Sequence, residues 1–89
     1  MNVFGALADP TRARIVEMLA EREIAAGEIA GRFDMTAPAV SQHLKILRAA
    51  GLVRVRVAGQ RRMYALDAGA LRELDAWLER FRRFWSTRG

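Results

Sequence analysis

Residues 36–51 read TAPAVSQHLKILRAAG, and both ends of this stretch carry the signals of a helix. Thr36 can accept a hydrogen bond from a free amide of the first turn, and Pro38 within that turn has no amide to leave unpaired. Gly51 provides the left-handed backbone conformation that commonly follows a last helical turn. We therefore predict a helix over residues 37–50.

One side of this helix is apolar and the other is polar. Val40, Leu44 and Leu47 recur at helical spacing, which places them on one stripe that faces a core. The start of the helix carries short or polar side chains, which let a helix approach a DNA major groove and pair with base edges. An ordinary amphipathic helix with a solvated outer face has the same pattern. The residues predicted to face the bases are Thr36, Ala37, Ser41, Gln42 and His43.

Shorter helices upstream complete a helix-turn-helix. Asp9 and Pro10 mark a helix start, and apolar residues at helical spacing continue to about residue 22. Residues 23–26 are predicted as a connection, and a short helix follows over residues 26–33. A turn of about three residues then leads to the helix over residues 37–50, and this is the spacing of a helix-turn-helix.

A β-hairpin is predicted directly after these helices. Residues 52–58 alternate valine with arginine, Gly59 and Gln60 form a turn, and residues 61–66 return with Tyr64 as an apolar position. A basic hairpin behind such a helix is typical of a winged helix-turn-helix, whose wing contacts DNA phosphates or the minor groove. Arginines on an edge strand also protect a sheet against aggregation, which is the alternative. The predicted fold class is mainly α with one small β-hairpin.

The positive charge of the chain lies in one segment. There are 15 basic and 10 acidic side chains, and no acidic residue occurs between Asp34 and Asp67. A basic segment in a small domain indicates a surface that binds a polyanion, most often nucleic acid, although a face that only keeps the protein soluble has the same composition. We predict double-stranded DNA as the partner. The residues predicted to contact its backbone are Lys45, Arg48, Arg54, Arg56, Gln60, Arg61 and Arg62.

A last helix, predicted over residues 68 to about 87, carries more apolar surface than one small core needs. Its leucines and aromatic residues recur at spacings of three and four, and further apolar residues occur near the start of the chain. The alternatives are a two-fold dimer and a stripe that covers the chain's own core; we favour the dimer. The predicted interface consists of Val3, Phe4, Leu7, Leu71, Leu74, Trp77, Leu78, Phe81, Phe84 and Trp85.

The composition excludes several kinds of chemistry. There is no cysteine, which excludes disulfides, thiolate metal sites and cysteine nucleophiles. His43 is the single histidine and has no obvious catalytic partner, so we expect it to contact DNA phosphate or to pack beneath its helix. The carboxylates Glu73, Asp75 and Glu79 suit hard ions better than zinc or copper. We expect no catalytic residue, no cofactor and no metal.

Length and hydropathy limit the organisation of the chain. Its 89 residues, with a mass of 10.0 kDa, predict one domain over residues 1–89. No window approaches the roughly 18 apolar residues of a membrane span, and the start of the chain does not resemble a signal peptide. We expect a cytoplasmic protein without a membrane partner.

Four stretches of the sequence together resemble the ArsR family of bacterial winged helix-turn-helix repressors. They are LADPTR at residues 7–12, PAVSQHLKIL at 38–47, AGLV at 50–53 and GQRRMY at 59–64. The resemblance implies a homodimer joined through its first and last helices, with the helix from Ala37 in the major groove and the wing beside it. It also implies a repressor, frequently of its own operon, that an inducer releases from a pseudo-palindromic operator.

The chain departs from many members of this family because it has no cysteine to sense a metal. It is similar to the cysteine-free branch, in which the signal is a small molecule, a partner protein or unknown. Two other functions remain as alternatives. A winged-helix module that binds an acidic protein would favour exposed aromatic residues at the helix start, where this sequence has short polar ones. A small enzyme would need a nucleophile with its base or a metal cluster, and the sequence shows neither.

Overall fold

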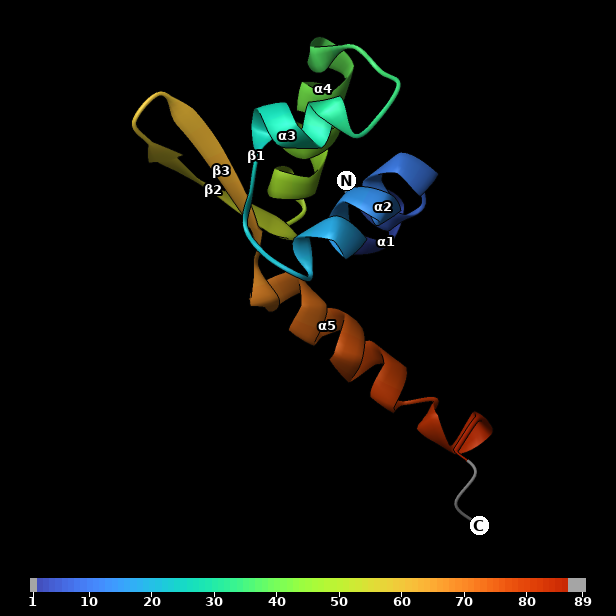
Figure 1. Ribbon diagram of the computed structural model, residues 1–89. Coiled ribbons are helices and arrows are strands. Elements are labelled where there is room, and N and C mark those ends of the chain that lie inside the picture. Colours follow the sequence, from blue (N-terminus) through green and yellow to red (C-terminus); the bar gives the residue numbers. More distant parts are fainter. Residues whose placement is uncertain (1, 87–89) are drawn as a thin grey trace.

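The computed structural model describes residues 2–86, which fold into helices and a three-stranded sheet (Figure 1). The elements in chain order are α1 (Val3–Leu7), α2 (Pro10–Leu19), β1 (Ile24–Ala25), α3 (Ala26–Gly31), α4 (Ala37–Ala49), β2 (Val53–Ala58), β3 (Arg61–Leu66), α5 (Ala68–Glu79) and a short 3-10 helix, η1 (Arg82–Phe84). None of the helices in this part of the chain is long and apolar enough to cross a membrane.

The helix signals in the sequence correspond to real caps. The hydroxyl oxygen of Thr36 accepts a hydrogen bond from the amide of Ala39 at 3.2 Å, and Gly51 has a φ of +78° just beyond α4. The Asp9 carboxylate accepts a hydrogen bond from the amide of Arg12 at 3.0 Å and begins α2. The helix-turn-helix prediction is therefore confirmed, although α2 and α3 end sooner than predicted, at Leu19 and Gly31.

The core lies where α2, α3 and α4 meet one face of the sheet. Val40, Leu44 and Leu47 of α4 are fully or almost fully buried, as the apolar stripe predicts. They belong to one cluster with Ile15 of α2 and Ile29 of α3. Because all three helices bury a side of themselves in this cluster, the rotation of α4 about its axis is fixed.

The predicted hairpin is present, and it gains a third strand. β2 and β3 pair antiparallel with Ala58 opposite Arg61, so Gly59, which has a φ of +65°, and Gln60 form a two-residue turn. β1 pairs with the free edge of β3, with Ile24 opposite Tyr64, giving the strand order β1-β3-β2. The prediction of a plain connection over residues 23–26 is wrong here, because two residues are too few to show the alternation of a strand.

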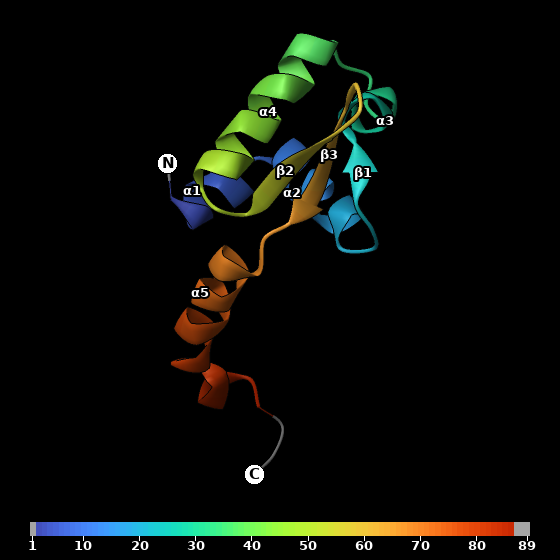
Figure 2. The same cartoon turned by 90° about the vertical axis from the view of Figure 1, so that its left-hand side faces the viewer.

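α5 leads away from the rest of the molecule, as Figures 1 and 2 both show. The extents of 52 × 24 × 23 Å and the radius of gyration of 14.7 Å exceed the roughly 12 Å expected of a compact chain of this length. Ala70 is the one residue of α5 that is buried. Beyond Ala70 and Leu71, most of the apolar stripe therefore does not cover the chain's own core.

The last helix also ends earlier than predicted. α5 stops at Glu79, and the chain continues through a turn into η1, while residue 87 lies outside the described residues. The sequence here, FRRFWS over residues 81–86, is rich in aromatic residues of modest helix propensity. They lie at the far end of α5, away from the helices and the sheet that form the core (Figure 1).

A buried arginine ties the start of the chain to the core. Arg12 is 8% exposed; its Nε donates to the carbonyl oxygen of Ala6 at 2.7 Å, and its Nη2 donates to that of Gly5 at 3.3 Å. These carbonyls belong to the last turn of α1, where the amide of Ala8 bonds to Gly5 but no amide follows to bond to Ala6. Arg12 therefore joins α1 to α2 and satisfies the end of the shorter helix.

We expect Arg12→Ala to lower the free energy of unfolding by about 2–3 kcal/mol, because it leaves the carbonyl oxygen of Ala6 without its donor and removes one of the two donors to that of Gly5. Urea unfolding followed by circular dichroism measures the change. Arg14→Ala is the matched control, since Arg14 is exposed on the same helix, and it should stay within about 0.5 kcal/mol of the wild type. Equal losses in the two variants would contradict the role given to Arg12.

Candidate nucleic-acid interface

The outward face of α4 presents the residues predicted to meet DNA bases. Ser41, Gln42 and Lys45 are exposed, as are Ala37 at the first turn and Arg48 near the last. Burial of the apolar stripe turns these side chains away from the core. Thr36 is also exposed, but its oxygen already caps the helix, so its hydroxyl hydrogen is the part left for another partner.

His43 occupies the flank of α4 that faces α2. Its side chain is 18% exposed, and its Nδ1 lies 3.4 Å from Nη1 of Arg12 and 3.9 Å from Oδ2 of Asp9. The hydrogen bond from the Arg12 amide, with the neighbouring positive charges, lowers the pKa of Asp9. We expected His43 either to contact DNA phosphate or to pack beneath its helix, and these contacts correspond to the second role.

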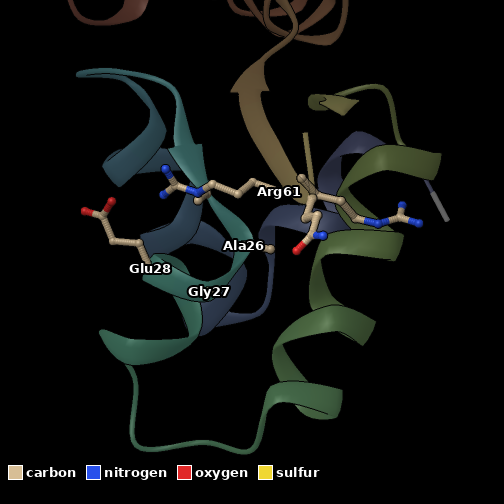
Figure 3. Close-up of a pocket in the computed structure, with 7 residues that line it drawn as sticks. Ala26, Gly27, Glu28 and Arg61 are labelled. Carbon is tan, nitrogen blue, oxygen red and sulfur yellow. The ribbon is translucent and has the colours of Figure 1, made fainter. Parts of the chain in front are cut away.

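The wing carries its arginines on both faces of the hairpin. Gln60, Arg61 and Arg62 are exposed at the tip. Side chains alternate along β3, so Arg62 shares a face with Tyr64 while Arg61 lies on the opposite face. A groove of about 560 Å³ is lined by Arg61 of the wing and by Ala26 and Gly27 at the start of α3. Figure 3 shows how these residues lie around it.

Arg56 is bound to an acidic side chain that is distant in the sequence. Its Nε and Nη2 donate to the two carboxylate oxygens of Glu23 at 2.8 and 2.7 Å. These hydrogen bonds, with the positive charge of Arg56 and of the neighbouring Arg54, lower the pKa of Glu23 and leave it ionised. Arg56 is therefore held by Glu23 partway along β2, although the sequence suggested a free cation.

Other arginines also form ion pairs with carboxylates, so fewer arginines remain available to bind phosphate. Glu28 accepts hydrogen bonds from both Arg22 and Arg32. Within residues 2–86, by contrast, five basic residues among the predicted contacts form no ion pair with a carboxylate. They are Lys45, Arg48, Arg54, Arg61 and Arg62. All five belong to α4 or to the wing, so both elements keep positive charge that a polyanion can bind.

The carboxylates of α5 do not form a metal site in the described part of the chain. No three histidine, aspartate or glutamate side chains gather closely enough there to hold an ion. Glu79 instead accepts a hydrogen bond from Arg82 at 2.7 Å. The described acidic residues of α5 therefore suggest no cation.

An aromatic row runs along α1, α5 and η1, away from the wing and the start of α4. Phe4 meets Trp77 edge to face at 5.1 Å between ring centroids, Trp77 lies 4.8 Å from Phe81, and Phe81 lies 6.4 Å from Phe84. Residues of the predicted dimer interface differ in burial. Val3, Leu7 and Leu71 pack partly against the core, Leu74 and Phe81 are half-buried, and Phe4, Trp77, Leu78, Phe84 and Trp85 are between 41% and 70% exposed.

The sequence did not predict three structural features of this region. The contact of Phe4 with Trp77, the pairing of Glu23 with Arg56 and the burial of Arg12 each join residues from different elements. No periodicity or local spacing relates the first two pairs. For Arg12 the only local signal is its position three residues after the Asp9 cap, which gives no indication of its contacts with α1.

Comparison with known proteins gives consistent matches. The model of the bacterial regulatory protein, arsR family, matches residues 9–55. The chain is 53% identical over 76 residues to the HTH-type transcriptional regulator Rv2034 of Mycobacterium tuberculosis, covering 85% of this chain and 71% of that protein. It is 36% identical over 80 residues to the transcriptional repressor SdpR of Bacillus subtilis, covering 90% and 89%. The crystal structure of the ArsR family transcriptional regulator RHA00566 is similar with a TM-score of 0.82 and 31% identity, covering 97% and 89%.

The ion pair between Glu23 and Arg56 predicts a pH-dependent stability. Because the pKa of Glu23 is lowered from its ordinary value of 4.5, the pair stabilises the fold above that value and stops doing so as the pH falls through the lowered pKa. We expect Glu23→Gln to lower the melting temperature at pH 7, with the difference from wild type disappearing in acid. Thermal unfolding between pH 7 and pH 3 measures this.

Glu17→Gln is the matched control for this experiment. Glu17 is exposed on α2 and pairs with no cation within residues 2–86, so its loss should leave the melting temperature unchanged. A deficit of Glu23→Gln that stayed constant down to pH 3 would show that the carboxylate charge is not the stabilising feature.

Proposed function

The chain belongs to the arsR family of bacterial regulatory proteins, and on that premise we propose that it is a homodimeric repressor that binds a pseudo-palindromic operator. It is a DNA-binding transcriptional regulator and not an enzyme. We further propose that the protein regulates its own gene and that an effector releases it from the operator. Repression in particular is supported by the similarity to the repressor SdpR.

The observation that carries the proposal is the placement of free cations beside the exposed start of α4. Lys45 and Arg48 on α4, with Arg61 and Arg62 on the wing, supply phosphate contacts and a salt-dependent affinity. Ser41 and Gln42 meet base edges in the major groove, with Thr36 and Ala37 at the closest approach. Further backbone contacts come from Gln60 and Arg54.

Two predicted contact residues take a supporting role in this proposal. Arg56 is held by Glu23, so it fixes β2 of the wing to the segment before β1. His43 lies against Asp9 and Arg12, so it helps to set α4 on α2. Both act on DNA binding through the placement of the elements that touch DNA.

The aromatic row provides the proposed dimer interface. Exposed apolar side chains of α1, α5 and η1 form a surface that the monomer leaves in water, and large patches of this kind mark association sites. A two-fold axis along this surface places two copies of α4 on one side, for half-sites about one helical turn of DNA apart. In this arrangement residues 1–89 act as one DNA-binding domain that contains its own dimer interface.

Repression follows from occupancy of the operator. A dimer bound across a promoter excludes RNA polymerase sterically, and an operator near the protein's own gene makes the system autoregulatory. Because the chain has no cysteine, we propose that the effector that ends repression is not sensed by thiolates.

The test is a gel-shift titration of the purified protein on its own upstream DNA and on a random duplex, at two salt concentrations. A specific shift that weakens steeply with salt, at two chains per site, supports the proposal. Binding without preference would contradict an operator in that DNA. No binding at low salt would reject DNA as the partner and favour an acidic protein.

Gln42 and Arg61 should differ in what their loss does to DNA binding. Gln42→Ala should cost about 1–3 kcal/mol per half-site on the operator and little on random DNA, because the amide pairs with a base edge. Arg61→Ala should weaken binding to all sequences and reduce the salt slope by about 1, because it loses a phosphate. Fluorescence anisotropy on both duplexes separates these patterns. Equal losses of Gln42→Ala on the two duplexes would refute its role.

Leu78→Glu should convert the protein to a monomer and abolish tight operator binding, because it buries a charge in the proposed interface. Leu78 is 41% exposed, so the change leaves the fold of the monomer intact. Sedimentation velocity measures the mass. Ala76→Glu, on the opposite face of α5, is the matched control and should remain a dimer. An unchanged dimer mass for Leu78→Glu would show that the interface lies elsewhere.

A further inference from the structure

A hollow of about 210 Å³ lies behind the first two turns of α4. Its walls come from α3, α4 and β3, and small residues such as Gly27, Ala30 and Ala37 leave the space open. Val40 and Leu44 contribute apolar surface from the stripe that α4 buries. The hollow therefore joins the core to the surface that the proposed function gives to DNA.

Two polar groups of β3 reach this hollow without a partner of their own. Tyr64 is 8% exposed, and its hydroxyl makes no hydrogen bond within residues 2–86; since no buried polar side-chain atom of the described chain lacks a partner, this hydroxyl is the part of Tyr64 open to solvent. Arg62 lines the same hollow and pairs with no carboxylate of the described chain. A donor hydroxyl and a guanidinium together at one apolar hollow favour a ligand with a negative charge.

The dimensions and chemistry of the hollow define the ligand class. Its volume equals that of roughly seven water molecules, which is smaller than the usual drug-sized pocket. Apolar walls favour a compact hydrocarbon body, and Arg62 and Tyr64 favour a carboxylate at one end. We propose that this hollow binds a small apolar carboxylate, of the size of benzoate, and that this ligand releases the protein from its operator.

The release follows from residues that the two partners share, and it rests on the proposed function. Arg62 contacts a phosphate in that function, and Ser41, at the rim of the hollow, faces the bases. A carboxylate paired with Arg62 takes that cation from the DNA, and the ligand body lies against the first turns of α4. Ligand and operator therefore lower each other's affinity by the same factor.

Benzoate is the probe, and its binding is measured first without DNA. In a titration followed by ¹H–¹⁵N correlation spectra, benzoate should shift the amide signals of Gly27, Ala30 and Ala37. The neutral amide benzamide should bind at least tenfold more weakly, because it offers no charge to Arg62. Absent shifts at these amides, or equal binding of benzamide, would overturn the proposal even if the operator is bound normally.

Operator affinity is then measured by fluorescence anisotropy with sodium benzoate exchanged against sodium chloride at constant ionic strength. Saturating benzoate should raise the operator Kd about fivefold or more. An unchanged operator Kd in the presence of bound benzoate would overturn the inducer role. Failure of the wild type to bind any operator would reject the proposed function, while the titration without DNA still decides whether the hollow is a ligand site.

Two variants test the site itself. Tyr64→Phe removes only an unpartnered hydroxyl, so it should keep the operator affinity and weaken benzoate about tenfold. Ala30→Leu fills the hollow and should abolish benzoate binding; Ala20→Leu, an exposed position after α2, is its matched control and should change nothing. Unchanged benzoate affinity in both Tyr64→Phe and a folded Ala30→Leu would overturn the assignment of this site.

Discussion

The rest of the structure depends on the burial of Val40, Leu44 and Leu47 between α2, α3 and the sheet. A helix held by one apolar stripe has a fixed rotation, because a turn of one residue would bring a polar side chain such as Ser41 into the core. The same constraint therefore decides which residues of α4 face outward and which flank meets α2. It also explains why the hollow lies behind the outward face, since small residues of α3 and α4 meet there without filling the space.

The free positive charge of the wing depends on an acidic residue that is distant in the sequence. The segment between Asp34 and Asp67 has no acidic residue, but the fold brings Glu23 to Arg56 across the sheet. Arg56, which the sequence predicted as a phosphate contact, therefore forms an ion pair that holds β2 to the segment before β1. Within the basic segment the other cations form no ion pair, so the charge that it offers a polyanion is smaller by Arg56 than the sequence suggests.

The two ends of the molecule have different physical character. The start of α4 and the wing are polar and positively charged, whereas α1, α5 and η1 present aromatic rings to water. The contact between Phe4 and Trp77 links the first helix to the last and makes one continuous surface of them. This surface is the one that we propose as the dimer interface.

The sequence by itself determined the elements whose signals are local. The caps Asp9 and Thr36, the stripe of α4, Gly51 and the Gly59 turn each lie within a few residues of what they control, so the helix-turn-helix and hairpin could be predicted. The exposed residues of α4 and the wing followed from the same periodicities. Only the tertiary structure decided that β1 joins the sheet, that Arg12 is buried, that Arg56 is paired and that α5 ends at Glu79 away from the core. Each of these depends on a partner distant in the chain, or on the lack of one, and local propensity contains no information about such partners.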